Sequence, residues 1–176
     1  YQVNYVYSDI YGCADSAQRS FDVFIPTPVS LTLPASLCAD TTSIPLNTGL
    51  PVGGSYSGTG VTNATFQPHI VGRGLTQITY TYTDTNSCTS AITESLFIDS
   101  IPAVSMLGLG SAYCLQDASE SIIGIPGGGT YTGTTSGNIF NPEVEGVGTH
   151  IITYNFTDNN GCGNESVQTV DVHPNP

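Results

Sequence analysis

The sequence is poor in basic residues: its 176 residues include 2 Lys or Arg against 14 Asp or Glu, a formal net charge of −12. Nucleic acids and anionic membrane surfaces are bound mainly through basic side chains, so neither is an expected partner. The chain has no initiator Met, no basic leader and no apolar run of the length that a signal peptide or membrane helix needs. We therefore expect no membrane insertion. Because residue 1 falls inside an alternating pattern, we expect an excerpt of a longer protein.

Charge of either sign is scarce, at 9% of residues, whereas 39% are apolar. Disordered chains usually combine high charge with low hydrophobicity, so this composition predicts a folded protein. Trp is absent, and no segment has a helical pattern. Thr, Ser, Gly and Asn dominate the polar residues, which is typical of exposed β-sheet faces and turns.

A repeat organises the chain. Residues 53–88 read GGSYSGTGVTNATFQPHIVGRGLTQITYTYTDTNSC, and residues 128–162 read GGTYTGTTSGNIFNPEVEGVGTHIITYNFTDNNGC. The end of this motif occurs a third time, where Val3–Asp9 and Cys13 align with Ile78–Asp84 and Cys88. A period of this length indicates an array of small units. We expect the C-terminal strands of a truncated unit in 1–25 and complete units in 26–101 and 102–176.

Alternation of apolar and polar residues predicts a strand wherever it occurs. In the complete units, short alternating segments are separated by frequent turn residues, and each unit has one pair of cysteines. This pattern predicts an all-β fold of tandem immunoglobulin-like β-sandwich domains of about 75 residues, with one disulfide each. Without Trp, the aromatic core falls to Tyr80, Tyr154, Phe66 and Phe140. The predicted strands are 3–7, 21–25, 29–33, 44–46, 55–57, 65–68, 78–83 and 91–98, with the same order in the second complete unit.

Proline marks the boundaries of the units, at Pro26-Thr27-Pro28, Pro102 and Pro174-Asn175-Pro176. Proline fixes φ and restricts the residue before it, so these segments are extended and stiff. Linkers this short leave neighbouring units little freedom. The array is expected to be a semi-rigid rod.

The odd number of cysteines, five, is explained by the repeat. We predict the disulfides Cys38–Cys88 and Cys114–Cys162, with Cys13 bonded to a cysteine upstream of residue 1. Closing a loop of ~50 residues contributes roughly 4 kcal/mol. Such bonds need an oxidising compartment, which places the protein outside the cytoplasm. The alternatives are an intermolecular bridge from Cys13 and a zinc site, but no C-x-x-C motif is present and no His is close to a Cys.

Two polar turns offer oxygen atoms of the kind that bind Ca²⁺, Asp84-Thr85-Asn86 and Asp158-Asn159-Asn160. The simpler interpretation is an Asx turn before a strand. Tyr56 and Tyr131 are candidates for stacking on sugars, and packing within the sheet is the commoner role. Both alternatives stay open in the sequence.

Catalytic and cofactor chemistry is not expected. The glycine-rich segments 71–74 and 127–129 lack the helix and lysine of a phosphate loop, so positive-φ turns explain them. His69, His150 and His173 do not recur with a nucleophile or an acid at repeated positions. We therefore expect no catalytic residues, no metal and no cofactor, and we predict that the protein is not an enzyme.

The string G-G-x-Y-x-G … F-x-P … G-x-G … I-T-Y-x-[YF]-T-D-x-N-x-C resembles the immunoglobulin-like repeats of very large surface proteins of gliding Bacteroidota, and the likeness covers the whole chain. The resemblance implies export by the type IX secretion system and a role in adhesins, stalks or surface filaments. The end, 172–176, resembles the start of a type IX sorting domain, with His173 in place of the usual Tyr; an ordinary linker is the alternative. The O-glycan attachment pattern of these bacteria fits Ser16, Thr41 and Ser100.

These observations predict a structural repeat segment of an extracellular bacterial surface adhesin, stalk or filament, which provides reach and stiffness. Its expected partners are other copies of itself in a multi-chain filament, surface glycans or other cells. One alternative is a spacer or carbohydrate-binding accessory module of a secreted hydrolase. Another is an array stiffened by Ca²⁺.

Overall fold

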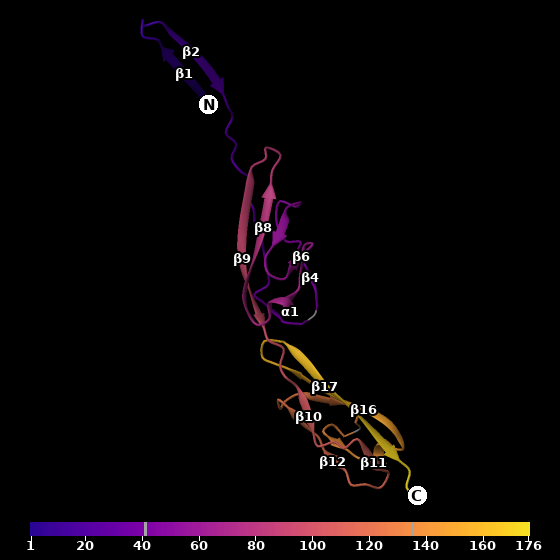
Figure 1. Ribbon diagram of the computed structural model, residues 1–176. Helices are drawn as coiled ribbons and strands as arrows, with labels where there is room; N and C mark the ends of the chain where they lie inside the picture. Colours follow the sequence, from indigo (N-terminus) through magenta and orange to yellow (C-terminus); the bar gives the residue numbers. More distant parts are fainter. Residues whose placement is uncertain (41, 135) are drawn as a thin grey trace.

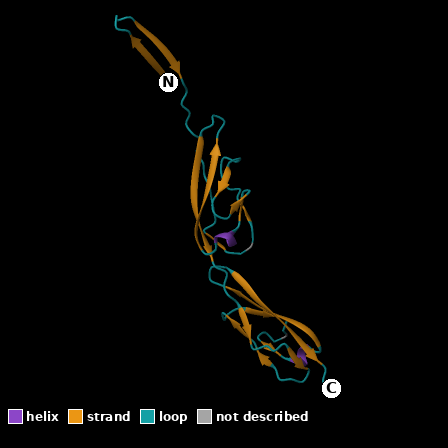
Figure 2. Cartoon of the chain, in the orientation of Figure 1, coloured by secondary structure: helices purple, strands orange, loops and turns teal. Residues whose placement is uncertain are grey.

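The computed structural model describes residues 1–40, 42–134 and 136–176. It is mostly β: an N-terminal hairpin, the first repeat (residues 26–101) and the second repeat (residues 102–176) follow one another along an extended molecule (Figure 1). Strands dominate each repeat, with a short helical turn in each (Figure 2). No helix in these ranges has the length and apolar character that crossing a bilayer requires.

The N-terminal hairpin consists of β1 (Gln2–Ser8) and β2 (Ala14–Ser20), paired antiparallel. All residues of both strands are exposed. The predicted strand over 21–25 is wrong. The residues that pair with β1 are Ala14–Ser20, and directly after them the Phe21 N–H donates to the Tyr1 carbonyl at 2.9 Å.

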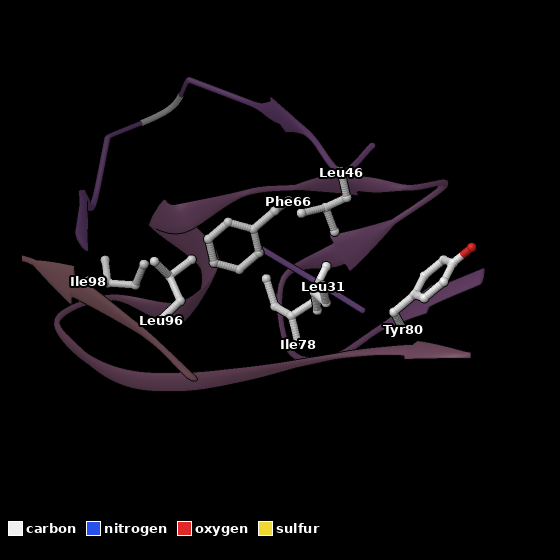
Figure 3. Close-up of a cluster of buried hydrophobic side chains, with 7 residues drawn as sticks. All are labelled: Leu31, Leu46, Phe66, Ile78, Tyr80, Leu96 and Ile98. Atoms are coloured by element: carbon white, nitrogen blue, oxygen red, sulfur yellow. The ribbon is translucent and has the colours of Figure 1, made fainter. Parts of the chain in front are cut away.

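The first repeat has one four-stranded sheet, one three-stranded sheet and the helix α1 (Pro68–Val71). The hairpin of the two longest strands, β8 and β9, forms the centre of the larger sheet, and β3 pairs parallel to the end of β9. The smaller sheet lies across the core from it (Figure 3). In sheet order the strands are β3 (Ser36–Cys38), β9 (Thr89–Asp99), β8 (Gly74–Thr83) and β5 (Ser55–Ser57), then β4 (Ile44–Pro45), β7 (Thr65–Phe66) and β6 (Val61–Thr62).

The second repeat has the same four-stranded arrangement, again with a parallel pair at one edge, together with two separate strand pairs and the helix α2 (Pro142–Glu145). The sheet order is β11 (Ala112–Cys114), β17 (Gly163–His173), β16 (Gly148–Thr157) and β14 (Thr130–Thr132). The pairs are β10 (Ser105–Leu107) with β13 (Ile123–Ile125) and β12 (Glu120–Ser121) with β15 (Ile139–Phe140).

Each repeat has its own hydrophobic core. The first consists of Leu31, Leu46, Phe66, Ile78, Tyr80, Leu96 and Ile98 (Figure 3), and the second of Met106, Ile122, Phe140, Ile152, Tyr154, Val170 and Val172. The alternating apolar residues of β8 and β16 therefore point into the cores, as predicted. The aromatic core is also confirmed, because its four rings are at most 1% exposed.

Glycines of the repeat motif make room for the core tyrosines. A Cβ on Gly54 would lie 2.5 Å from the ring of Tyr80, and a Cβ on Gly129 would lie 2.6 Å from the hydroxyl of Tyr154. Each tyrosine hydroxyl accepts a hydrogen bond from a glycine N–H at 2.8 Å, from Gly54 in the first repeat and Gly129 in the second. The glycines and the tyrosine thus recur together because they occupy one packing site.

Two further expectations are wrong. Residues 29–33 are not a strand: their β-pairing is an isolated bridge between Ser30 and Leu50, outside the named strands, although Leu31 is buried. Helices were also not expected. Each begins with a proline at its first position and ends before a glycine after four residues, which is too short for a helical periodicity to appear in the sequence.

Candidate functional site at the junction between the repeats

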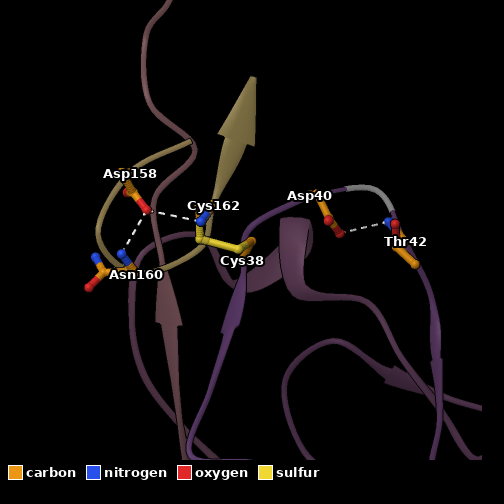
Figure 4. The surroundings of a disulfide bond; sticks show 6 residues. All are labelled: Cys38, Asp40, Thr42, Asp158, Asn160 and Cys162. Carbon is orange, nitrogen blue, oxygen red and sulfur yellow. Dashed lines mark hydrogen bonds between the residues drawn. A yellow bond between two sulfur atoms is a disulfide. The ribbon is translucent and has the colours of Figure 1, made fainter. Parts of the chain in front are cut away.

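A disulfide joins the two repeats. It links Cys38, the last residue of β3, to Cys162, in the turn before β17, with their Cα atoms 5.5 Å apart and a sequence separation of 124 (Figure 4). The tip of the second repeat's hairpin is thereby attached to the far end of the first repeat's sheet. Cys162 is 1% exposed, so the bond is covered on that side.

The predicted disulfides Cys38–Cys88 and Cys114–Cys162 are wrong. Within one repeat the two cysteines lie at opposite ends of the longest strand. Cys38 pairs with Asp99 at the end of β9, whereas Cys88 directly precedes the first residue of β9. Eleven strand residues span roughly 35 Å, and a disulfide needs Cα atoms about 4.4–6.8 Å apart. The same holds in the second repeat, where Cys114 pairs with His173 at the end of β17.

An aspartate shapes the hairpin tip that carries Cys162. The Asp158 carboxylate accepts hydrogen bonds from the backbone N–H groups of Asn160 and Cys162, each at 2.9 Å (Figure 4). The Asp158 N–H in turn donates to the Cys162 carbonyl at 3.0 Å. These bonds fix the turn, and they fix the position of the cysteine relative to the two strands.

On the first repeat, the disulfide is attached at the end of β3, next to the segment that follows this strand. The Ala39 N–H donates to the Asp99 carbonyl at 2.8 Å, which continues the parallel pairing of β3 with β9 past Cys38. The Asp40 carboxylate then accepts from the Thr42 N–H at 2.9 Å (Figure 4). A hollow of about 250 Å³ beside the disulfide is lined by Cys38, Asp40 and Thr42, among others, together with Pro68 of α1 and Asn160 of the incoming hairpin.

The linkers also contact the hairpins that follow them. Between the repeats, the Asn164 side-chain amide donates to the Pro102 carbonyl at 2.9 Å. Before the first repeat, the Thr27 hydroxyl donates to the Asp84 carboxylate at 3.3 Å. The pKa of Asp84 lies below its ordinary value of 3.8, chiefly because of the hydrogen bond from the Cys88 N–H, with further bonds from Asn86 and Thr27. Each linker is therefore held against the tip of the next hairpin.

The other three cysteines are thiols: Cys13 and Cys114 are exposed, and Cys88 is half-buried. Cys13 and Cys88 occupy the hairpin position that Cys162 holds in the second repeat, and Cys114 occupies the strand position that Cys38 holds in the first. Sequence reasoning found these two positions and missed their partner. The sequence feature that argues against a disulfide within a repeat is the long strand that separates its two cysteines.

The turns considered for Ca²⁺ are Asx turns. The carboxylates of Asp84 and Asp158 each accept two backbone N–H groups of their own turn. Within the described residues, no three His, Cys, Asp or Glu side chains are grouped so that they could hold a metal ion. In each turn, one carboxylate oxygen of the aspartate, Oδ1, is thus engaged by backbone N–H groups of the protein itself.

Tyr56 and Tyr131 pack within the sheets. Their rings lie 4.8 and 4.7 Å from those of Tyr80 and Tyr154, and their hydroxyls accept the N–H groups of Gly49 and Gly124. Both side chains are half-buried. This packing leaves neither ring as a free platform for a sugar.

The remaining candidates are dispersed. Of the glycine-rich segments, Gly72, Gly74 and Gly128 have positive φ, as predicted for turns. His69 and His173 are exposed, while the His150 ring nitrogen lies 2.8 Å from the Gly146 carbonyl oxygen. Ser16, in β2, and Ser100, after β9, are exposed, and Thr41 lies outside the described residues.

Comparison with known proteins gives little further information. No family model matches the sequence, and no curated protein matches it. One solved structure with some likeness is a Ca²⁺-stabilised adhesin that helps an Antarctic bacterium reach out and bind ice. The two chains are 10% identical with a TM-score of 0.33, and the alignment covers 99% of this chain and 57% of that one. This chain thus spans little more than half the length of that structure, and a likeness at this level carries no functional argument.

Proposed function

We propose that the chain is a structural segment of an extracellular bacterial surface adhesin, stalk or filament, and that its function is to transmit tension between its ends. The observation that carries this proposal is the Cys38–Cys162 disulfide between consecutive repeats. A bond that only stabilised one repeat would lie inside it. This bond instead links two repeats that follow one another along the length of the molecule.

Through the disulfide, tension can pass along covalent bonds without stretching the part of the chain that forms most of both cores. Tension applied at the ends passes from residue 38 to residue 162 through the sulfur atoms, and the 124-residue separation between them is removed from the stretched path. The shielded part includes Tyr80, Tyr154 and the whole β8–β9 hairpin. The repeats then keep their fold under a load that would extend an unbridged chain.

Finer features of the proposal are supported by the sequence. Two β-rich repeats with separate cores support tandem immunoglobulin-like sandwiches, for which we keep the proposed bounds 26–101 and 102–176. A disulfide is expected outside the cytoplasm. The motif supports export by the type IX system in Bacteroidota. The protein is proposed to be a non-enzymatic component of the cell surface.

Self-association of chains side by side is supported by the exposed faces of the long hairpin. On the β8–β9 sheet, Thr79 and Thr93 share a hydrogen bond at 2.8 Å, and Thr83 and Thr89 share one at 3.0 Å. Such uncharged faces have little charge to desolvate on contact, although the net charge of −12 opposes association. The carbohydrate-binding alternative has less support, because Tyr56 and Tyr131 are packed inward.

Single-molecule stretching of the full chain between its termini tests the proposal. Without reductant, the bonded chain should extend over a contour shorter by roughly 420 Å than the reduced chain, because the disulfide bypasses a sequence separation of 124. The matched control is Cys88→Ser, which removes a thiol of the same repeat and should leave both lengths unchanged. Equal lengths with and without reductant would refute the tension route.

A further inference from the structure

The second repeat ends in the same arrangement that receives the hairpin of its neighbour. Cys114 is the last residue of β11, as Cys38 is the last residue of β3, and both strands pair parallel to the end of the longest strand. The next N–H continues this pairing in both: Leu115 donates to the His173 carbonyl at 2.9 Å, as Ala39 does to Asp99 at 2.8 Å. Cys114 is nevertheless an exposed thiol.

The hairpin tips at the other end are also alike. In the turns that carry Cys13 and Cys88, the carboxylates of Asp9 and Asp84 accept the cysteine N–H at 2.9 Å, as Asp158 does for Cys162. The aspartate N–H donates back to the cysteine carbonyl at 2.9–3.0 Å in all three turns. These two thiols are therefore held in the conformation of the bonded hairpin cysteine.

The linker gives a third, independent match. The junction before the first repeat ties Thr27 of its linker to the hairpin tip at Asp84, and the bonded junction ties Pro102 of its linker to the hairpin at Asn164, next to its tip. In both, the chain enters a repeat alongside that repeat's own hairpin. A repeat that precedes this hairpin would bring the end of its β3-type strand to the tip.

We propose that Cys114 and Cys88 are the two open ends of a disulfide ladder. Cys114 bonds to the hairpin cysteine of a further repeat of this kind that follows it, and Cys88 bonds to the strand cysteine of one that precedes it. Cys13 is the hairpin cysteine one step further back. Each bond forms by oxidation of two thiols, with two protons and two electrons passed to the thiol oxidant of the extracellular compartment. The ligand of each end is thus another copy of the same unit.

The ladder rests on the proposed tension-bearing role and extends it from one junction to every junction of an array. Each repeat contributes its strand cysteine to one neighbour and its hairpin cysteine to the other, so no repeat closes a bond within itself. If the ladder is wrong, the Cys38–Cys162 disulfide and the difference in contour length that it predicts are unaffected. The two proposals can therefore be separated.

The test adds one repeat to the full chain. A second copy of residues 103–176 is joined after Pro176, with Thr157→Ser in the added copy as a mass tag, since Thr157 is exposed. The chain has five cysteines and one disulfide, so three thiols. The extended protein has two more cysteines, and the ladder predicts that it still has three thiols. Peptide mapping should then find Cys114 bonded to the tagged hairpin peptide.

The matched control is Cys114→Ser in the extended protein, which should leave the added hairpin cysteine free and give four thiols. A second extended protein has a copy of residues 26–101 inserted after residue 101. It keeps the test decisive if the added copy of 103–176 does not fold. There the strand cysteine of the first copy should bond to the hairpin cysteine of the added copy. An inter-repeat bond in either version supports the ladder. Added hairpin cysteines that are free, or bonded within their own repeat, in both versions would overturn it.

Discussion

The two repeats have the same cysteine positions and opposite cysteine states. In the first repeat the strand cysteine, Cys38, is bonded and the hairpin cysteine, Cys88, is a thiol. In the second repeat Cys162 of the hairpin is bonded and Cys114 of the strand is a thiol. The backbone pairing and turn hydrogen bonds at equivalent cysteines are nevertheless alike. The disulfide is therefore a property of the junction and is not a property of the individual repeat.

This difference separates two sources of stability. Each repeat holds itself together with its own core and its tyrosine–glycine site, which are equivalent in the two repeats. The junction adds a covalent constraint that involves one cysteine of each. Substitutions in the cores should therefore affect the two repeats alike, whereas substitutions of cysteines should not.

The largest expected effect comes from breaking the junction. Cys38→Ser should lower the free energy of unfolding of the two repeats together by about 5 kcal/mol, because the bond closes a loop with a sequence separation of 124. Cys114→Ser, at the equivalent position of the other repeat, should have almost no effect. Urea denaturation of both variants without reductant measures this difference. Equal losses in the two variants would contradict the asymmetry of the repeats.

The second effect tests the equivalence of the cores. Ile78→Ala and Ile152→Ala remove fully buried side chains at the same position of β8 and β16. Each should destabilise its own repeat by about 2–5 kcal/mol. Ile151→Ala, at a side chain that is 61% exposed, is the control. Hydrogen exchange resolved by repeat should show each loss in the substituted repeat, and a loss shared by both would mean that the cores are not separate.

The third effect tests the tyrosine–glycine site. The Tyr80 hydroxyl accepts from Gly54 N–H and donates to the Pro51 carbonyl, and the Tyr154 hydroxyl does the same with Gly129 and Pro126. Replacing either tyrosine by Phe leaves these backbone groups without their partner, at a cost of about 1–3 kcal/mol. Thermal denaturation should give similar losses for both. A neutral effect in one repeat would show that its backbone groups find water instead.

The smallest effect is a pH dependence at the N-terminal junction. Because the pKa of Asp84 is lowered in the folded protein, ionised Asp84 stabilises the fold, and this contribution is full above the ordinary value of 3.8. It is lost as the pH falls below 3.8 through the lower pKa of the folded state. Asp84→Asn should therefore be less stable than the parent at neutral pH and approach it in acid. A difference between them that does not change with pH would contradict this assignment.

The sequence predicts the repeat interiors well because their determinants are local. Alternation in β8 and β16 identifies the inward residues, and the glycine–tyrosine spacing marks one packing site. The N-terminal hairpin has the same alternation, yet Val3 and Tyr5 are 56% and 66% exposed, whereas Ile78 and Tyr80 are at most 1% exposed. Alternation thus defines which face is apolar and does not show what covers it.

The junction could not be read from the same patterns. Its bond depends on β3 pairing parallel to the end of β9 and on the hairpin of one repeat reaching the next. Neither pairing leaves a periodicity in the sequence. One constraint was nevertheless present: Cys88 directly precedes a long alternating segment, and a strand of that length keeps it far from Cys38. The number of cysteines in each repeat indicates that bonds form, while the length of the strand between the two cysteines excludes a bond within one repeat.

Disulfide mapping of the unreduced full chain tests the central claim most directly. After thiols are blocked, cleavage at Arg19, Arg73 and the five Glu residues places each bonded cysteine in a different peptide. The account predicts a bond between peptides 20–73 and 146–165, with Cys13, Cys88 and Cys114 recovered as blocked thiols. Peptide 20–73 bonded to 74–94, together with 95–120 bonded to 146–165, would show that each repeat closes its own disulfide and would contradict the junction.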